Sequence, residues 1–220
     1  EEKLGDLAIA RWTDEPCSDP VPREAINQII ATLTPGSRYD YQVTVVKSPM
    51  INALAAPGGR LVIFTGLLEK TRTPEELAGI LAHEVQHVEQ RHATKALFRQ
   101  FAAQILLAAI VGNTQELSTV LESADTLGNL HASRETELEA DREGMKRIQR
   151  ARIDSKGMLQ AYEKLGRETE SLPRGWDLLS THPHWGERVT WLKALATEAQ
   201  YEPIPLLPGV DWKSIRTSCH

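Results

Sequence analysis

The sequence has no apolar stretch long enough to cross a membrane as a helix. The longest one, residues 101–112 (FAAQILLAAIVG), falls well short of the roughly 20 residues that a bilayer requires. We interpret it as a buried helix, and contact with a membrane surface around Leu106 is the alternative. The chain opens on EEKLGD, without the basic start and apolar segment of a signal peptide, so we expect no signal peptide within it.

Basic clusters, repeats and cysteines are also missing or few. The net charge is −5 and the basic residues are dispersed, which argues against a nucleic-acid-binding surface. We find no internal repeat and no low-complexity segment. The two cysteines, Cys17 and Cys219, lie near opposite ends of the chain. They either form a disulfide in an oxidising compartment or remain two free thiols.

The rest of the composition is that of an ordinary globular protein, with 41% hydrophobic and 25% charged residues among 220. This length favours one domain, residues 1–220. Residues 21–36 carry apolar side chains at helical spacing, and helical patterns fill most of the second half. Segments 39–48 and 60–68 are rich in β-branched and aromatic residues, and the APGG turn between them predicts a small antiparallel sheet. We therefore expect a mainly helical α+β fold.

The segment ILAHEVQHVEQ lies within a long helix predicted for residues 73–112, with Thr73 as its N-cap. His83 and His87 are four residues apart, so both imidazoles can reach one ion from the same helix face. Glu84 lies roughly 100° away and can reach a water on that ion. Zinc with an open position lowers the pKa of such a water to about 7, and a carboxylate can then take its proton during peptide hydrolysis.

The same short pattern also occurs by chance on solvent-exposed helices. The flanking side chains Ile80, Leu81, Ala82, Val85 and Val88 are apolar, however, and predict that this helix is buried. Buried histidines and carboxylates require partners. We therefore favour a metal site over a solvated helix face.

A third ligand is offered by the segment HASRETELEADREG, residues 131–144. Glu137 and Asp141 are four residues apart in a helical pattern. Two histidines and a carboxylate form a known catalytic zinc set, so we assign Glu137 as the third ligand. We assign Asp141 as the acceptor that fixes a ligand imidazole through its other ring nitrogen. The alternative is a solvated acidic helix face, because other glutamates crowd this stretch.

Four segments, in the order NALAAPGGRLVIFTGLL, EELAGILAHEVQHVEQRH, SRETELEAD and LSTHPHWGER, resemble the successive signatures of metallopeptidase family 48. The similar stretch runs from Asn52 to Leu192, within a motif-bearing core of residues 50–195. The resemblance implies a gluzincin-type zincin fold, one Zn²⁺ per chain and endopeptidase activity. It also implies the ligands His83, His87 and Glu137, with Glu84 as general base.

The resemblance further implies an extracytoplasmic location in the bacterial periplasm, as for soluble members of the family. Contact with a membrane surface or with outer-membrane assembly is a further expectation. The chain lacks the transmembrane helices of the integral-membrane members, and no tetratricopeptide-like repeat follows its protease segment. Prenyl-protein processing and recognition through such repeats are therefore not expected.

The last segment places His182 in a loop and Arg188 at the start of an amphipathic helix. Members similar to this chain carry a histidine near the metal at the matching position, so we count both residues among the catalytic candidates. His182 either donates to the developing oxyanion or occupies the fourth zinc position and blocks the water. The alternative is a loop histidine that caps local backbone. His92, His131 and His184 are interpreted as structural.

Substrate binding is expected along the strand at residues 60–66, read as an exposed edge that accepts an extended peptide as an added strand. Its wall would include Asn52, Gly58, Gly59, Leu61 and Ile63. For the glycines, closing a hairpin is an equal alternative. Backbone recognition favours unfolded or misassembled polypeptides as substrates.

A competing function is a zinc-bearing chaperone or adaptor that binds polypeptides without cutting them. Glu84 argues against it, because a structural zinc has no use for a base. A zinc hydrolase that acts on other bonds is discouraged mainly by the four family-like segments.

Overall fold

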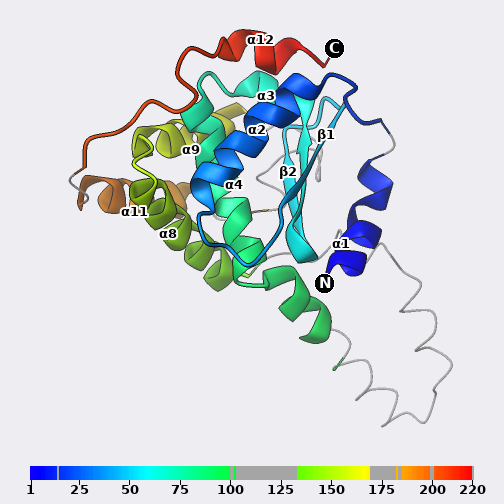
Figure 1. The fold of residues 1–220 in the computed structure, drawn as a ribbon. Helices are drawn as coiled ribbons and strands as arrows, with labels where there is room; N and C mark the ends of the chain where they lie inside the picture. The colour runs from blue at the N-terminus through cyan, green and yellow to red at the C-terminus, as the bar shows by residue number, and fades with distance from the viewer. Residues whose placement is uncertain are drawn as a thin grey trace, which may run out of the picture.

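The computed structural model describes residues 1–13, 15–99, 102, 133–168, 182, 185–198 and 201–219. Its helices are α1 (Glu2–Ile9), the short 3₁₀ helix η1 (Ala10–Trp12), α2 (Pro20–Leu33), the 3₁₀ turn η2 (Pro57–Gly59), α3 (Thr65–Lys70), α4 (Pro74–Glu89), α8 (Arg134–Arg150), α9 (Ser155–Glu168), α11 (Trp185–Glu198) and α12 (Trp212–Thr217). Its strands are β1 (Gln42–Val46), β2 (Ala53–Ala56) and β3 (Arg60–Phe64). Helices predominate over one small sheet, which confirms the mainly helical α+β class (Figure 1).

The sheet is mixed, with the strand order β1-β3-β2. β1 pairs parallel with β3, and β2 pairs antiparallel with it. The prediction that segments 39–48 and 60–68 form an antiparallel pair is therefore wrong. The reason is that residues 53–56, expected only to lead into the turn, form a strand of their own. That strand reverses the chain once more, so β1 and β3 run in the same direction.

The turn between β2 and β3 contains two glycines with positive φ, Gly58 at 74° and Gly59 at 85°. A Cβ on Gly58 would lie 2.6 Å from the backbone of Glu2 in α1, and one on Gly59 would lie 2.9 Å from the carbonyl oxygen of Asp40. Both positions therefore need glycine for conformation and for close approach. This observation favours the hairpin-closing interpretation of the two glycines.

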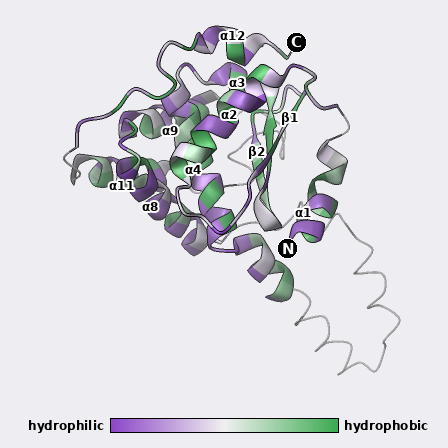
Figure 2. Ribbon diagram, in the orientation of Figure 1, coloured by the Kyte–Doolittle hydropathy of each residue, from purple (hydrophilic) through white to green (hydrophobic). Residues whose placement is uncertain are grey.

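The two faces of the sheet pack against different helices, because side chains alternate along a strand. Val43, Val45, Leu61 and Ile63 belong to the main core, which lies on the side of α2 and α4 (Figure 1). On the other face, Val62 and Phe64 pack with residues of the N-terminal segment, including Ile9 and Trp12. Figure 2 shows much hydrophobic green along the strands and more hydrophilic purple on α8 and α11.

Helix α4 begins as predicted, since the Thr73 side chain accepts a hydrogen bond from the Glu76 N–H and Pro74 follows it. The helix does not run on to residue 112, however. It ends at Glu89, and Arg91 adopts a φ of 56°, which interrupts the helix before residues 92–99 become helical again. The predicted single long helix is therefore wrong at this point.

The remainder of the predicted apolar helix, with the membrane contact at Leu106, lies outside the described residues except for Ala102. Within the described ranges, none of the helices combines the length and the apolar character that a membrane crossing requires.

A disulfide between Cys17 and Cys219 joins the N-terminal segment to the end of the chain, with 5.5 Å between the Cα atoms. The disulfide, as opposed to two free thiols, is therefore confirmed. The bonded segment also covers the outer edge of β1. The Cys17 N–H donates to Val45 O at 2.8 Å, and the Lys47 N–H donates to Glu15 O at 2.8 Å.

Candidate metal centre

The two acidic residues singled out in residues 131–144 lie on the buried face of α8. Ser133 caps this helix by accepting from the Thr136 N–H. Glu137 and Asp141 are both 0% exposed. Their four-residue spacing brings both carboxylates to the side that packs against α4, so the alternative of a solvated acidic face does not apply to them.

Four side chains from three parts of the chain converge at this place. Nε2 of His83 lies 2.9 Å from Nε2 of His87, one helical turn on. The carboxylate of Glu137 approaches these atoms to 3.4 Å and 3.3 Å. Nδ1 of His182 lies 3.1 Å from His83 Nε2 and from both Glu137 oxygens. One donor atom from each residue lies within 4.8 Å of all the others.

This donor set fits a divalent metal. Nδ1 of His83 lies 2.9 Å from Asp141 Oδ1, which accepts its proton and leaves the lone pair of Nε2 directed at the cluster. Ligand atoms about 2.0–2.1 Å from a tetrahedral zinc would lie about 3.3 Å from one another, close to the distances seen here. Two unprotonated ring nitrogens facing each other repel unless positive charge lies between them. The residues could therefore hold a metal ion.

The charges of the cluster lead to the same conclusion. The carboxylates of Glu84, Glu137 and Asp141 are all buried, and Arg188 supplies one guanidinium against them. Burial lowers the pKa of His83, but the charges of Glu137 and Asp141 outweigh it and raise that pKa to about 9. Burial lowers the pKa of His87 to about 3. The cluster thus favours additional positive charge, as a proton or as a cation.

Glu84 lies beside this donor set and is 1% exposed. Its Oε1 has no hydrogen-bond partner among the described residues, although Nε2 of His182 lies 3.3 Å away. Burial raises the pKa of this carboxyl group. An orphaned, buried carboxylate with a raised pKa is a group suited to accept and return a proton.

Arg188, at the start of α11, lies behind the carboxylates rather than in the donor set. It is 1% exposed and contacts Glu137 Oε2 at 2.8 Å and Asp141 Oδ2 at 2.6 Å. It also donates to the backbone oxygen of His182 at 3.1 Å. Its guanidinium thus contacts three parts of the cluster and lies behind Glu137, a place that favours a positioning role over the expected catalytic one.

His182 is described, while the residues on either side of it are not. Its side chain is 10% exposed and lies between two groups, with Nδ1 toward Glu137 and Nε2 toward Glu84. The interpretation of a loop histidine that only caps backbone does not fit this position.

The family model for peptidase family M48 matches residues 22–196. The chain belongs to this family. Among curated relatives, the beta-barrel assembly-enhancing protease of Yersinia pestis is 28% identical over 209 residues, which cover 88% of this chain and 42% of that protein. The mitochondrial metalloendopeptidase OMA1 of Arabidopsis thaliana is 34% identical over 149 residues, which cover 67% of this chain and 30% of that protein.

The human mitochondrial metalloendopeptidase OMA1 is 27% identical over 222 residues, which cover 89% of this chain and 42% of that protein. The M48 chain thus spans less than half the length of these relatives.

Two further residues contact the cluster of the M48 chain, and the sequence had not indicated these contacts. His92, interpreted there as structural, is 7% exposed, and its Nδ1 lies 2.9 Å from Nδ1 of His87. The hydroxyl of Tyr162 in α9 donates to Asp141 Oδ1 at 3.0 Å. His92 is the last residue of the second family-like segment, and Tyr162 lies in none of the four, but neither contact follows from the sequence pattern because both depend on how separate helices meet. His131 and His184 lie outside the described residues.

The expected substrate wall of the M48 chain needs correction. β3 is the central strand, so residues 60–66 are not an exposed edge. Leu61 and Ile63 are 0% exposed and belong to the core. Asn52 is 1% exposed, and its Oδ1 accepts from the Ala53 N–H at 2.8 Å. The strand order makes β2 the edge on the side of the metal centre, and Ala55 lines a small cavity together with His87 and Val88.

Proposed function

We propose that the chain is a zinc-dependent endopeptidase domain with a gluzincin-type site. The observation that carries the proposal is the convergence of His83, His87 and Glu137, with the buried carboxylate of Glu84 next to them. Membership of peptidase family M48 supports the same conclusion. Asp141 and Arg188 would hold the ligands in place.

A zinc ion in this donor set would polarise a peptide carbonyl and lower the pKa of a coordinated water to about 7. Glu84 would accept the proton of the attacking water and return it to the leaving amine. Its burial supports this role, because a raised pKa brings the carboxyl closer to the pH at which it must both take and give a proton. Asp141 would keep His83 in the tautomer that directs Nε2 at the metal.

The test is the cleavage of casein by zinc-loaded protein and by the Glu84→Gln variant. We expect Glu84→Gln to lower kcat by about 10²–10⁴-fold, because a general base contributes that much. Zinc content, measured by atomic absorption, should stay the same. A competing function is a zinc-bearing chaperone or adaptor. Casein binding with equal or absent cleavage in both proteins would favour it and contradict the peptidase proposal.

We further propose that His182 closes the site at rest. Its Nδ1 lies within the donor set, and its Nε2 lies beside Glu84, where the attacking water is required. A zinc site with four protein ligands is typical of structural sites, whereas catalysis needs an open position. Self-inhibition would then end when the His182 side chain leaves the donor set.

The His182→Ala variant distinguishes this role from oxyanion stabilisation. A switch ligand predicts faster casein cleavage by the variant. An oxyanion donor predicts a decrease of about 100-fold or more at unchanged zinc content. The second result would contradict self-inhibition and leave the peptidase proposal intact.

For substrate binding, we propose the free edge of β2. The Phe64 N–H donates to Asn52 O, so alternation along an antiparallel pair directs the N–H and C=O of Ala55 away from β3. The opposite edge of the sheet, on β1, is covered by residues 15–17. An extended polypeptide that added to β2 would pass beside His87, with backbone hydrogen bonds and little sequence preference.

Ala55→Pro tests this edge, because proline removes the outward N–H and leaves the β2–β3 hydrogen bonds in place. We expect KM for casein to rise by about 2–10-fold, the equivalent of one net hydrogen bond. Ala55→Ser is the matched control and should keep the KM of the wild type. An unchanged KM in Ala55→Pro would exclude β2 as the binding edge.

We propose unfolded or misassembled polypeptides as the substrates. We propose an extracytoplasmic compartment, the bacterial periplasm, as the location, and contact with outer-membrane assembly as a further expectation. The name of the Yersinia pestis relative refers to β-barrel assembly, and that of the Arabidopsis thaliana relative to mitochondria. The disulfide supports an oxidising compartment. Alkylation of the native protein before reduction, followed by mass spectrometry, should find Cys17 and Cys219 unmodified.

A further inference from the structure

His92 lies in a position that the proposed mechanism does not use. Arg91, two residues past the end of α4, adopts a φ of 56°, and His92 follows it. Nδ1 of His92 lies 2.9 Å from Nδ1 of His87, and the two rings meet edge to face with centroids 4.9 Å apart. On the other side of the ring, Nε2 lies 3.3 Å from Oε2 of Glu139 on α8.

We propose that His92, backed by Glu139, is a positioning residue that fixes the tautomer and ring orientation of His87. This inference rests on the proposed zinc site. It concerns the nitrogen of His87 that faces away from the metal donors, and it gives a role to two side chains outside the four-residue cluster.

The proton arrangement follows from the partners of each nitrogen. An ionised carboxylate accepts hydrogen bonds but has no proton to donate, so Nε2 of His92 carries the proton of its contact with Glu139. In a neutral His92 ring, Nδ1 is then an acceptor, and the contact with His87 requires that His87 Nδ1 carries the proton. Nε2 of His87 is left with a free lone pair, which points at His83 and Glu137.

The opposite arrangement would prevent metal binding. If His92 donated from Nδ1, Nε2 of a neutral His87 would carry a proton directed at His83 Nε2, 2.9 Å away. That nitrogen could not ligate a metal. Glu139 therefore selects the productive tautomer of His87 through the His92 ring, just as Asp141 does directly for His83.

Helix α8 thus serves both motif histidines. Glu137 points into the donor set, Asp141 holds His83, and Glu139 holds the residue that contacts His87. The side chain of Glu139 is 39% exposed, whereas that of Asp141 is 0% exposed. Water competes for the outer carboxylate, so we expect Glu139 to matter less than His92 itself.

The experiment measures zinc affinity by competition with a chromophoric chelator, which does not depend on peptidase activity. We expect His92→Leu to raise the zinc Kd by about 10–100-fold, as for other partners of metal-ligating histidines. His92→Asn places an amide oxygen near the position of Nδ1 and should recover most of this loss. A purely structural role would predict equal losses for both variants and would overturn the proposal.

Glu139→Leu and Glu135→Leu form a matched pair. The two glutamates lie two residues after and two residues before Glu137 on α8, and each substitution removes one negative charge. Only Glu139 of the two contacts His92 in the structure. We expect a several-fold rise in the zinc Kd for Glu139→Leu and none for Glu135→Leu. An equal rise in the zinc Kd of both variants would mean that Glu139 acts only through its negative charge, and it would contradict the proposal.

A second measurement reads the tautomer directly. In ¹⁵N-histidine-labelled, zinc-loaded wild-type protein, NMR should find His92 protonated at Nε2 and unprotonated at Nδ1. The opposite tautomer would overturn the inference. This test uses the wild type, so it holds even if His92→Leu fails to fold, which circular dichroism of the metal-free variant would reveal.

The two proposals fail in different ways. If the wild type does not bind zinc, or binds it equally after His87→Ala, the zinc site itself is wrong. If binding depends on His87 but His92→Leu stays within about twofold of the wild type, only the role of His92 is wrong.

Discussion

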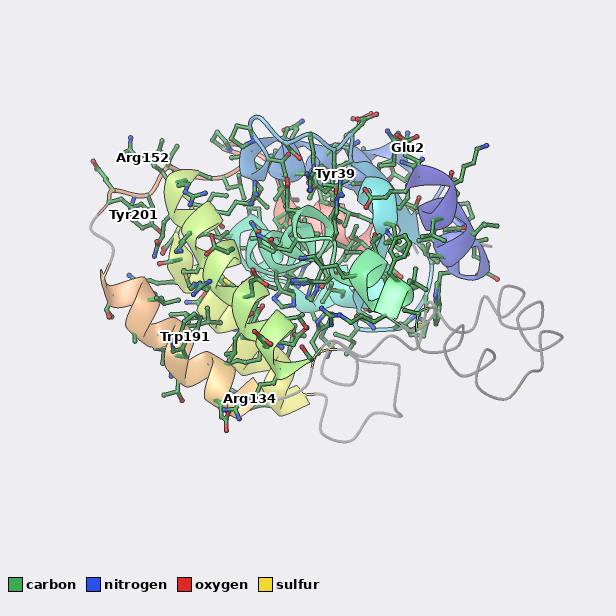
Figure 3. All side chains as sticks on the ribbon, turned by 90° about the horizontal axis from the view of Figure 1, so that it is seen from below. Glu2, Tyr39, Arg134, Arg152, Trp191 and Tyr201 are labelled. Carbon is green, nitrogen blue, oxygen red and sulfur yellow. A yellow bond between two sulfur atoms is a disulfide. The ribbon has the colours of Figure 1, made fainter. Side chains whose placement is uncertain are left out.

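Two buried regions of the molecule lie side by side and are built on different principles. The polar cluster between α4, α8 and α11 consists of His83, Glu84, His87, Glu137, Asp141, His182 and Arg188. The apolar core between α2 and the sheet consists of such residues as Ile26, Ile29, Val45, Leu61 and Ile63. Figure 3 shows α8 and α11 side by side at the border of the first region, with Arg134 at one end of α8 and Trp191 on α11.

In the apolar core, burial itself stabilises the fold, and one contact can replace another. In the polar cluster, burial costs free energy for each charge, and every group depends on one particular partner. Side chains are therefore buried to the same extent in both regions, but burial has opposite energetic consequences in them. It indicates stability in the first case and a site maintained for binding in the second.

Removing the guanidinium of Arg188 from the polar cluster should have the largest effect on stability. Arg188→Met leaves the carboxylates of Glu137 and Asp141 without their guanidinium. We expect the free energy of unfolding in urea, measured with a chelator present, to fall by about 3–5 kcal/mol. Arg134→Met is the control, because its pair with Glu187 is equally short but exposed, and it should cost about 0–1 kcal/mol. An equal loss of unfolding free energy in both variants would mean that the buried ion pairs do not differ from the exposed one.

Opening the disulfide should have an intermediate effect that leaves the polar cluster intact. The double variant Cys17→Ser/Cys219→Ser loses a link between residues 202 positions apart. We expect a loss of about 2–4 kcal/mol in urea unfolding. Wild-type protein in a strong reductant should behave in the same way. A change in zinc Kd beyond about twofold would mean that the terminal link supports the metal centre as well.

Trimming the apolar core should have the smallest effect. Ile29 of α2 is 0% exposed and belongs to the main core. Ile29→Val removes one methylene group and should cost about 0.5–1.5 kcal/mol in urea unfolding. The zinc Kd and the cleavage rate per folded molecule should not change. A loss of zinc affinity in Ile29→Val would show that the two regions are coupled through α4.

The predictions from sequence succeeded where a local pattern determines the outcome. The Thr73 N-cap and the apolar flanks of His83 and His87 led correctly to a buried helix α4. The four-residue spacing of Glu137 and Asp141 led to two carboxylates on one buried helix face. Such patterns are local because 3.6 residues per turn fix which side chains share a face.

The predictions failed where distant segments decide. The strand signal of residues 60–66 was correct, but whether β3 is central or at the edge depends on the pairing of β1 and β2. The helical pattern after His87 was correct as well, but the pattern did not predict that the helix is interrupted at Arg91. The contact of His92 with His87 depends on that interruption, so no spacing rule could reveal it.

The sequence by itself determined the donor types, their presence on two helices and the apolar flanks that bury them. Only the tertiary structure decided that Arg188 contacts Glu137, that His92 contacts His87 and that Tyr162 contacts Asp141. It also decided that β2 forms the sheet edge on the metal side. The physical reason is the range of the interactions. Helix periodicity and capping act within a few residues, whereas hydrogen bonds between buried charges depend on how whole elements pack, which the local pattern does not encode.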